Sequence, residues 1–507
     1  MHINTKLLVI ILCFIFVGVG IGYIVNTSQD AISENFDSLS STTEQPIVSH
    51  AQTAELDEKT DDPEADLTPE PVPKYIFLVI GDGMGAPHLK IGDLYKKIET
   101  GDMSRVGIWE SFEHKSMVTA GKNSSKGGTM LATGMDIPSG PISWDAGVDF
   151  ITIMDIAKSY GFATGVVTQS DLTDATPATF LSHSDSRNKS VDISRDFHTS
   201  NVDFIMGGGL EYMFSKQTAE YKPDWIGTKT LSHVNTGDVY KTLEKSGYTV
   251  YLGQDGRAPF YSDKVNEKTL YSIERNNLPF NYLRKQEKNS VAFKPFPELS
   301  EMVQKAIDSL IIDTDGFLIM VEQSTIDDAG HVKESAYVAA EMGVMDQTLS
   351  TIMDFYNEHP DDTLVILTAD HETGNHSFDQ KKFEQLDEIE ENLPWSSSVD
   401  TINTYLYENF KIRTGNLNIE QTKRYMNSNF FDNEFENKMY ASSVIVAKVQ
   451  EKLGIFLRTD YHSNQDVPLY TQGFSADAFM ASESIRDVPH TICDIMGWEN
   501  ILGLPAE

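Results

Sequence analysis

Four short apolar runs recur along the chain. They cover residues 75–80 (YIFLVI), 163–168 (ATGVVT), 317–322 (FLIMVE) and 363–370 (TLVILTAD). Each run is continuous rather than alternating, which is typical of a strand buried on both faces of a parallel sheet. Segments with helical spacing lie between them, such as 113–118 (EHKSMV) and 334–358. Strands that alternate with helices predict an α/β fold, a three-layer α/β/α sandwich around a mostly parallel sheet.

The first 73 residues follow a different pattern. After Lys6, an uncharged apolar run extends from Leu7 to Val25, which is close to the length of a bilayer span. It predicts export to a periplasmic or other extracytoplasmic location, with residues 1–25 either retained as a membrane anchor or cleaved as a signal peptide. Residues 26–73 are acidic, rich in Ser and Thr and punctuated by proline, which predicts a disordered linker. The folded domain is expected to span 74–507.

Composition narrows the range of partners. The 507 residues include 76 Asp and Glu against 40 Lys and Arg, a formal net charge of −36. Such a surface repels a phosphate backbone, so a nucleic-acid partner is not expected. Membrane contact is expected only through the N-terminal run. The two cysteines are Cys13, inside that run, and Cys493, so the folded part has no pair for a disulfide.

Polar residues suited to metal binding stand at the ends of the apolar runs. Asp82 follows the first run, Glu322 ends the third, and Asp370 with His371 closes the fourth. The carboxyl ends of parallel strands meet at one edge of a sheet, so these side chains are expected to converge. Further candidates come from other segments: Ser124, Thr176, Arg187, Asp327, His331 and His462.

The residue types indicate two kinds of metal. Asp327 and His331 are spaced i, i+4, which places both on one side of a helix as two ligands of one zinc ion. Asp82 has two oxygens and can bridge two metals, while Glu322 and Thr176 offer the oxygen ligands that magnesium prefers. Two zinc ions roughly 4 Å apart clamp the attacking and leaving oxygens of an in-line displacement. Singly, each residue has a simpler interpretation, such as a turn former or a surface histidine, but their coincidence at strand ends favours one site that transfers a phosphoryl group to water.

The motifs together resemble the alkaline phosphatase family. They are DGMG (82–85), SxxxxTxLATG (124–134), DATP (174–177) with an Arg eleven residues after its Thr, VExxxID followed by AGH (321–331), TADHETG (368–374) and a late His before VP. The resemblance extends from about residue 74 to the C-terminus. It implies that Ser124 is the nucleophile and Arg187 the phosphate clamp. It also implies three metal sites: one zinc on Asp327, His331 and His462, a second zinc on Asp82, Asp370 and His371, and one magnesium on Asp82, Thr176 and Glu322.

The implied reaction is hydrolysis of small phosphate monoesters to alcohol and inorganic phosphate. A metal-activated Ser124 attacks phosphorus, a phosphoserine forms, and a metal-activated water hydrolyses it. Arg187 holds two non-bridging oxygens in bidentate fashion. The resemblance also implies a homodimer.

The chain departs from the family pattern near the nucleophile. Asn123 stands where relatives usually carry Asp. Lys126 replaces a small residue; it either adds positive charge near the phosphate or points to solvent, and solvent is the favoured expectation. Asp328 follows Asp327 where relatives carry Lys, His or Trp. If the Asp328 carboxylate faces bound phosphate, it should weaken product binding. Residues from about 376 to 460 are expected to form an insertion before the last zinc ligand.

Other functions stay open at this point. A phosphodiesterase or phosphonate hydrolase of the same superfamily would share the two zinc ions but lack the third metal, so Glu322 and Thr176 favour a monoesterase. A sulfatase is disfavoured because no cysteine stands at the nucleophile position. An inactive, metal-stabilised surface binding protein would not need Ser124, Arg187 and every ligand.

Overall fold

The computed structural model describes residues 71–100, 104–215, 237–253, 259–262, 268–279, 296–312, 315–331, 333, 335–378, 455–456 and 458–506. The expected anchor or signal (1–25), nearly all of the expected linker and most of the expected 376–460 insertion lie outside these residues. None of the helices in the described ranges is both long enough and apolar enough to cross a bilayer.

Nine of the described strands form one sheet, in the order β2-β15-β10-β1-β9-β5-β6-β8-β7. Neighbours from β10 to β7 pair in parallel, whereas β15 runs antiparallel to both β10 and β2. The sheet is therefore mostly parallel, as predicted. Its strands are β1 (Tyr75–Gly81), β2 (His114–Val118), β5 (Ala163–Asp171), β6 (Phe204–Gly208), β7 (Thr249–Leu252), β8 (Thr269–Ser272), β9 (Phe317–Gln323), β10 (Thr363–Thr368) and β15 (Val467–Gly473).

The four apolar runs form the centre of this sheet, as the adjacent strands β10, β1, β9 and β5. The helix expected at 113–118 is wrong, because His114–Val118 forms the edge strand β2. Its backbone pairs with β15, from Val118 opposite Val467 to His114 opposite Thr471. Over six residues, helical and strand periodicity cannot be separated, and a partner far along the chain decided the outcome.

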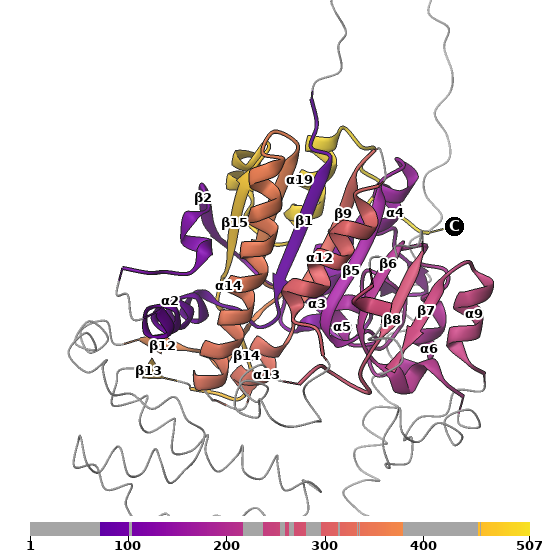
Figure 1. Ribbon diagram of the computed structural model, residues 1–507, viewed down its shortest axis with the longest axis horizontal. Helices are drawn as coiled ribbons and strands as arrows, with labels where there is room; N and C mark the ends of the chain where they lie inside the picture. The colour runs from indigo at the N-terminus through magenta and orange to yellow at the C-terminus, as the bar shows by residue number, and fades with distance from the viewer. Residues whose placement is uncertain are drawn as a thin grey trace, which may run out of the picture. The chain divides into compact units, whose positions relative to one another are not determined.

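Helices cover both faces of the sheet (Figure 1). On one face, α14 packs against both α2 and α12; on the other, α3 contacts α4, α5 and α19. Their bounds are α2 (Ala86–Thr100), α3 (Ser124–Thr133), α4 (Ile153–Ser159), α5 (Ala175–Ala178), α6 (Ser190–Asp196), α9 (Val239–Lys245), α12 (Leu299–Leu310), α13 (Thr325–His331), α14 (Ser335–Glu358) and α19 (Asp487–Met496). The three-layer α/β/α sandwich is confirmed.

Short elements complete the described part. They are the 3-10 turns η1 (Ile108–Ser111), η2 (Leu210–Met213) and η5 (Ala476–Ala481), and the two-residue strands β3 (Trp144–Asp145), β4 (Val148–Asp149), β11 (Glu372–Thr373), β12 (Ser377–Phe378), β13 (Ile455–Phe456) and β14 (His462–Ser463). The β11–β14 pair lies beside the candidate site.

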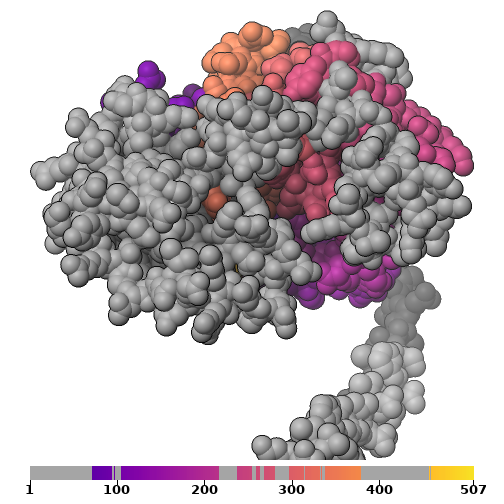
Figure 2. All heavy atoms as spheres, turned by 60° about the horizontal axis from the view of Figure 1, so that its bottom comes forward, coloured from indigo at the N-terminus to yellow at the C-terminus, as the bar shows by residue number. Residues whose placement is uncertain are grey.

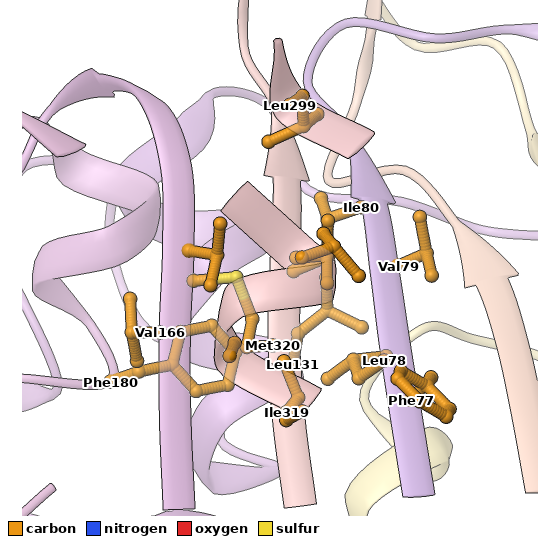
Figure 3. Packing of buried hydrophobic residues seen from close by; sticks show 14 of the residues in the cluster. Phe77, Leu78, Val79, Ile80, Leu131, Val166, Phe180, Leu299, Ile319 and Met320 are labelled. Carbon is orange, nitrogen blue, oxygen red and sulfur yellow. The ribbon is translucent and has the colours of Figure 1, made fainter. Parts of the chain in front are cut away.

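Strand β1 shows why the sheet is a rigid support. Phe77, Leu78, Val79 and Ile80 are all fully buried, although successive side chains point to opposite faces (Figure 3). The Phe77 ring meets Phe355 of α14 edge-on at 5.6 Å between centroids. Burying each such side chain contributes about 1.5–3 kcal/mol. The loops that follow the central strands therefore start from well-fixed positions.

Candidate active site

The candidate site lies at the carboxyl ends of the four central strands. Asp82 follows β1 directly, and Glu322 occupies the penultimate position of β9. In the sheet register, Glu322 lies between Ile80 of β1 and Thr168 of β5. Figure 2 brings this end of the sheet forward and shows described atoms from the purple, pink and orange parts of the chain there. Segments far apart in sequence therefore meet at one edge, as predicted.

The first predicted zinc set is brought together. His331 Nε2 lies 3.1 Å from Asp327 Oδ2, and His462 Nε2 lies 3.6 Å from Asp327 Oδ1. The Nδ1 atoms of the two rings lie 2.7 Å from the Asp460 carbonyl and 3.2 Å from the Lys122 carbonyl. Each Nδ1 therefore donates to a carbonyl, and the two Nε2 atoms face each other 3.1 Å apart. Such an arrangement fits a cation held between the rings.

The second predicted zinc set is also assembled. His371 Nε2 lies 3.3 Å from Asp82 Oδ1 and 3.2 Å from Asp370 Oδ2. These two carboxylate oxygens are buried and have no hydrogen-bond partner among the described residues. Asp327 also lies within reach of Asp82 and His371, with ligand atoms within 4.8 Å of one another. Asp327 therefore stands between the two sets, which sequence spacing did not predict.

The third predicted set is placed at the same end of the sheet. Thr176, in the short helix α5, lies 3.3 Å by its hydroxyl from Asp82 Oδ2. Glu322 accepts hydrogen bonds from Thr168 and, at 3.3 Å, from Ser170. Its other oxygen, Oε1, is buried without a hydrogen-bond partner in the described ranges. Asp82 thus has one oxygen toward the histidine set and one toward Thr176, as a bridging carboxylate requires.

The pKa shifts of the buried carboxyl groups in this site favour bound positive charge. Burial, followed by repulsion from Asp370, Asp327 and Glu322, raises the pKa of Asp82 well above its ordinary value. Burial raises the pKa of Glu322 to about 8, and burial together with Asp327 raises that of Asp370 to about 7. Burial also lowers the pKa of His371 to about 3, which leaves the ring neutral and able to ligate. Crowded buried carboxylates beside a neutral imidazole are a donor set that divalent cations stabilise.

Ser124 is the serine that faces this set. It is buried as the first residue of α3, and its Oγ lies 3.2 Å from His371 Nε2. The neighbouring Ser125 hydroxyl is engaged elsewhere: it donates to Asn123 Oδ1 at 3.0 Å and accepts from the Gly140 amide at 2.8 Å. The geometry therefore favours Ser124 as the nucleophile.

Arg187 lies near the same ligands. Its NH2 group donates to Asp174 Oδ1 at 2.8 Å. Its positive charge contributes to lowering the pKa of His371 and of His462, for both of which burial is the main cause. A guanidinium so placed can receive the oxygens of a phosphoryl group bound at Ser124.

Comparison with known proteins places the chain in one family. The family model described as alkaline phosphatase matches residues 73–497. The chain belongs to the alkaline phosphatase family.

Similar proteins of known family include other alkaline phosphatases at moderate sequence identity. The chain is 30% identical over 321 residues to alkaline phosphatase 3 of Bacillus subtilis, covering 60% of this chain and 62% of that protein. It is 27% identical over 336 residues to the repressible alkaline phosphatase of Saccharomyces cerevisiae, covering 59% and 55%. The match thus spans between 55% and 62% of the length of these two relatives.

Solved structures share the fold. Thermus thermophilus alkaline phosphatase superposes with a TM-score of 0.63 at 18% identity, covering 86% of this chain and 92% of that one. The alkaline phosphatase of the Antarctic bacterium TAB5 gives a TM-score of 0.56 at 22% identity, covering 84% and 99%.

Two departures from the alkaline phosphatase pattern are resolved by the structure. The expectation that Lys126 points to solvent is not met, because its ammonium pairs with Asp136 and its side chain is only 18% exposed. Asp328 accepts a hydrogen bond from Asn277 Nδ2 at 3.2 Å. Burial, with repulsion from Asp327, raises the pKa of Asp328 to about 7. Asp328 is therefore a partly enclosed carboxyl beside the expected metal ligand Asp327, not a free surface charge.

Sequence reasoning missed several supporting residues. Thr373 donates to Asp327 and lies 3.3 Å from His371 Nδ1, so it touches both predicted zinc sets. Asp174 holds Arg187, and Thr168 holds Glu322. Thr373 and Asp174 belong to the motifs TADHETG and DATP, so the motifs contained a signal for them. Thr168 could be found only from the register of β5 against β9.

Proposed function

We propose that this chain is a phosphomonoesterase that works through a phosphoserine on Ser124, with two zinc ions and one magnesium ion. The observation that carries the proposal is the buried Ser124 hydroxyl, 3.2 Å from His371 in a set of unpaired ligand atoms. Asp327, His331 and His462 would hold one zinc, Asp82, Asp370 and His371 the other, and Asp82, Thr176 and Glu322 the magnesium. When bound, these ions supply the positive charge that stabilises the serine alkoxide and the leaving oxygen.

The chain's own residues supply position and charge. Arg187, held by Asp174, binds two non-bridging oxygens of the ester and orients the phosphorus toward Ser124. Ser124 Oγ then forms a bond to phosphorus while the bond to the alcohol oxygen breaks, and the alcohol leaves with a proton. Water hydrolyses the phosphoserine and regenerates the hydroxyl. The amino end of α3 adds a favourable field for the phosphoryl group at Ser124.

The phosphoserine can be tested by mass spectrometry. The metal-loaded enzyme is incubated with inorganic phosphate, quenched in acid and mapped by fragmentation. We expect phosphate on Ser124, retained in Ser125→Ala and absent in Ser124→Ala. Phosphate on Ser125 alone would contradict the assignment.

The choice of substrate class has its own test. Members of the alkaline phosphatase family act on small phosphate monoesters, and Glu322 with Thr176 at a third metal site favours the same class here. Nitrophenyl phosphate should therefore turn over much faster than bis(nitrophenyl) phosphate. The reverse preference would indicate a phosphodiesterase. An activity that does not change when the metals are chelated, or when zinc and magnesium are restored, would contradict both metal-dependent enzymes.

We further propose export through the apolar run at residues 7–25, as anchor or signal, and assembly as a homodimer. The support is the composition of the run and, for the dimer, the family resemblance alone. Separation of periplasmic, membrane and cytoplasmic fractions tests the first proposal, and light scattering of the purified chain tests the second.

A further inference from the structure

A second buried polar cluster adjoins the candidate metal site but has no part in the proposed reaction. It consists of Glu372, His376 and His88, all at most 1% exposed. Glu372 directly follows the metal ligand His371 and forms strand β11 with Thr373. This strand pairs antiparallel with β14, so that Glu372 lies opposite Ser463 and Thr373 lies opposite the metal ligand His462.

The Glu372 carboxylate receives four hydrogen bonds. Oε2 accepts from the Ser463 hydroxyl and, at 3.1 Å, from the Asn375 amide. Oε1 accepts from the His376 amide at 2.9 Å and, at 3.3 Å, from its ring Nδ1, which also donates to the Thr373 carbonyl at 2.8 Å. Every partner is a donor, and only a carboxylate has acceptor sites on both oxygens for all four.

The cluster contains the residue types of a zinc triad, and their ligand atoms lie within 4.8 Å of one another. Its hydrogen bonds nevertheless oppose metal binding. The Gly85 amide donates to His88 Nδ1 at 3.1 Å, so the neutral ring carries its proton on Nε2. Both oxygens of Glu372 are already occupied. The remaining Nε2 lone pair of His376 is one ligand atom, not three.

Three loops that carry expected ligands meet on Glu372. The loop of Asp82 packs against it so closely that a Cβ on Gly85 would lie 2.3 Å from Glu372 Cγ. The loop of His371 leads directly into it. The segment of His462 is bonded to it through Ser463. A long stretch of chain separates His371 from His462. The β11–β14 pair and the Glu372 carboxylate therefore fix the position of His462 relative to His371.

We propose that Glu372 is a positioning residue that sets His462 against His371 for metal binding, and that the Glu372–His376–His88 cluster itself holds no metal. The proposal rests on the divalent-cation site of the proposed function. It concerns the affinity of the site for its metals rather than the chemical reaction. A residue that orients ligands from behind changes metal affinity roughly 10–100-fold when it is replaced.

The test measures metal release from the loaded enzyme. Glu372→Gln turns an amide NH2 toward either the Asn375 amide or the His376 donors, none of which can accept from it, so the hydrogen bonds on that side are lost. We expect a chelating dye to remove zinc on the order of 10–100 times faster than from the wild type. Ser463→Ala should shift the rate in the same direction by less, and it remains available if Glu372→Gln does not fold.

Asp203→Asn is a matched control. Asp203 is a buried carboxylate at the opposite, amino end of the strands, where it accepts from Lys158 at 2.7 Å and from the Thr164 amide at 2.9 Å. The Asp203→Asn substitution should lower the thermal stability and leave the zinc release rate unchanged. If a merely destabilised fold were the cause, Asp203→Asn would accelerate release as much as Glu372→Gln.

Two results would overturn the proposal. One is a zinc release rate equal to that of the wild type in both Glu372→Gln and Ser463→Ala. The other is an additional equivalent of metal in the wild type that is lost in His88→Gln. Because metal release is measured without turnover, the absence of monoesterase activity would refute the proposed function and leave this result interpretable.

Discussion

Chelation of the metals would leave buried carboxylates with no counter-cation, and their pKa values set the stability of the metal-free protein. Burial raises the pKa of Glu322 from 4.5 to about 8 and that of Asp370 from 3.8 to about 7. At 1.36 kcal/mol per pKa unit, either shift alone corresponds to roughly 4–5 kcal/mol. The two groups interact, so their contributions do not add in full, and we expect a combined effect of roughly 5 kcal/mol. Domains are stable by only about 5–15 kcal/mol.

The sign follows from linkage. A pKa that is raised in the folded state stabilises that state fully below the unfolded pKa, near 4, and the stabilisation is lost as the pH rises through the folded pKa. Metal-free protein should therefore lose stability between about pH 4 and pH 8. Zinc and magnesium hold the same carboxylates ionised, so the loaded protein should not show this loss.

Urea unfolding at pH 6 and pH 9 measures the effect. We expect the free energy of unfolding of the metal-free protein to fall by several kcal/mol between these values, and that of the loaded protein to change much less. Metal-free Glu322→Gln should show a smaller fall, because a neutral amide replaces the buried carboxyl group whose pKa is raised to about 8. Equal stability of the metal-free wild type at both pH values would refute the reasoning.

Two predictions concern phosphate binding. Asp174→Asn removes the ion partner of Arg187. Both side chains are about one-third exposed, so the ion pair contributes at most about 1 kcal/mol. The inhibition constant for phosphate should therefore rise by up to roughly fivefold. Asp328→Lys replaces a partly buried carboxyl beside Asp327 with a cation, so phosphate should inhibit several-fold more tightly. An unchanged constant for Asp328→Lys would show that the Asp328 side chain does not sense the bound anion.

The sequence was most informative where burial was complete. Strands β1, β9 and β10 are apolar at most positions because both of their faces are covered, so their identity and the convergence of Asp82, Glu322 and Asp370 could be predicted. The strand at 114–118 could not be, because β15 decides its conformation and lies some 350 residues later. The position of Asp327 between the two ligand sets could not be predicted from the sequence either. It depends on how α13 is set against β11, which no spacing encodes.

The pair Asn123 and Asp174 shows how the arginine clamp is built in this chain. Asn123 Oδ1 accepts from the Lys126 amide at 3.1 Å and from the Ser125 hydroxyl at 3.0 Å, so its one acceptor is used to cap α3. A neutral amide so engaged cannot hold a guanidinium. Asp174 holds it instead, and the Asp174 turn leads within two residues to Thr176, beside Asp82. The support of Arg187 and the expected magnesium ligand therefore lie on one turn, so a single short segment positions both the arginine clamp and Thr176.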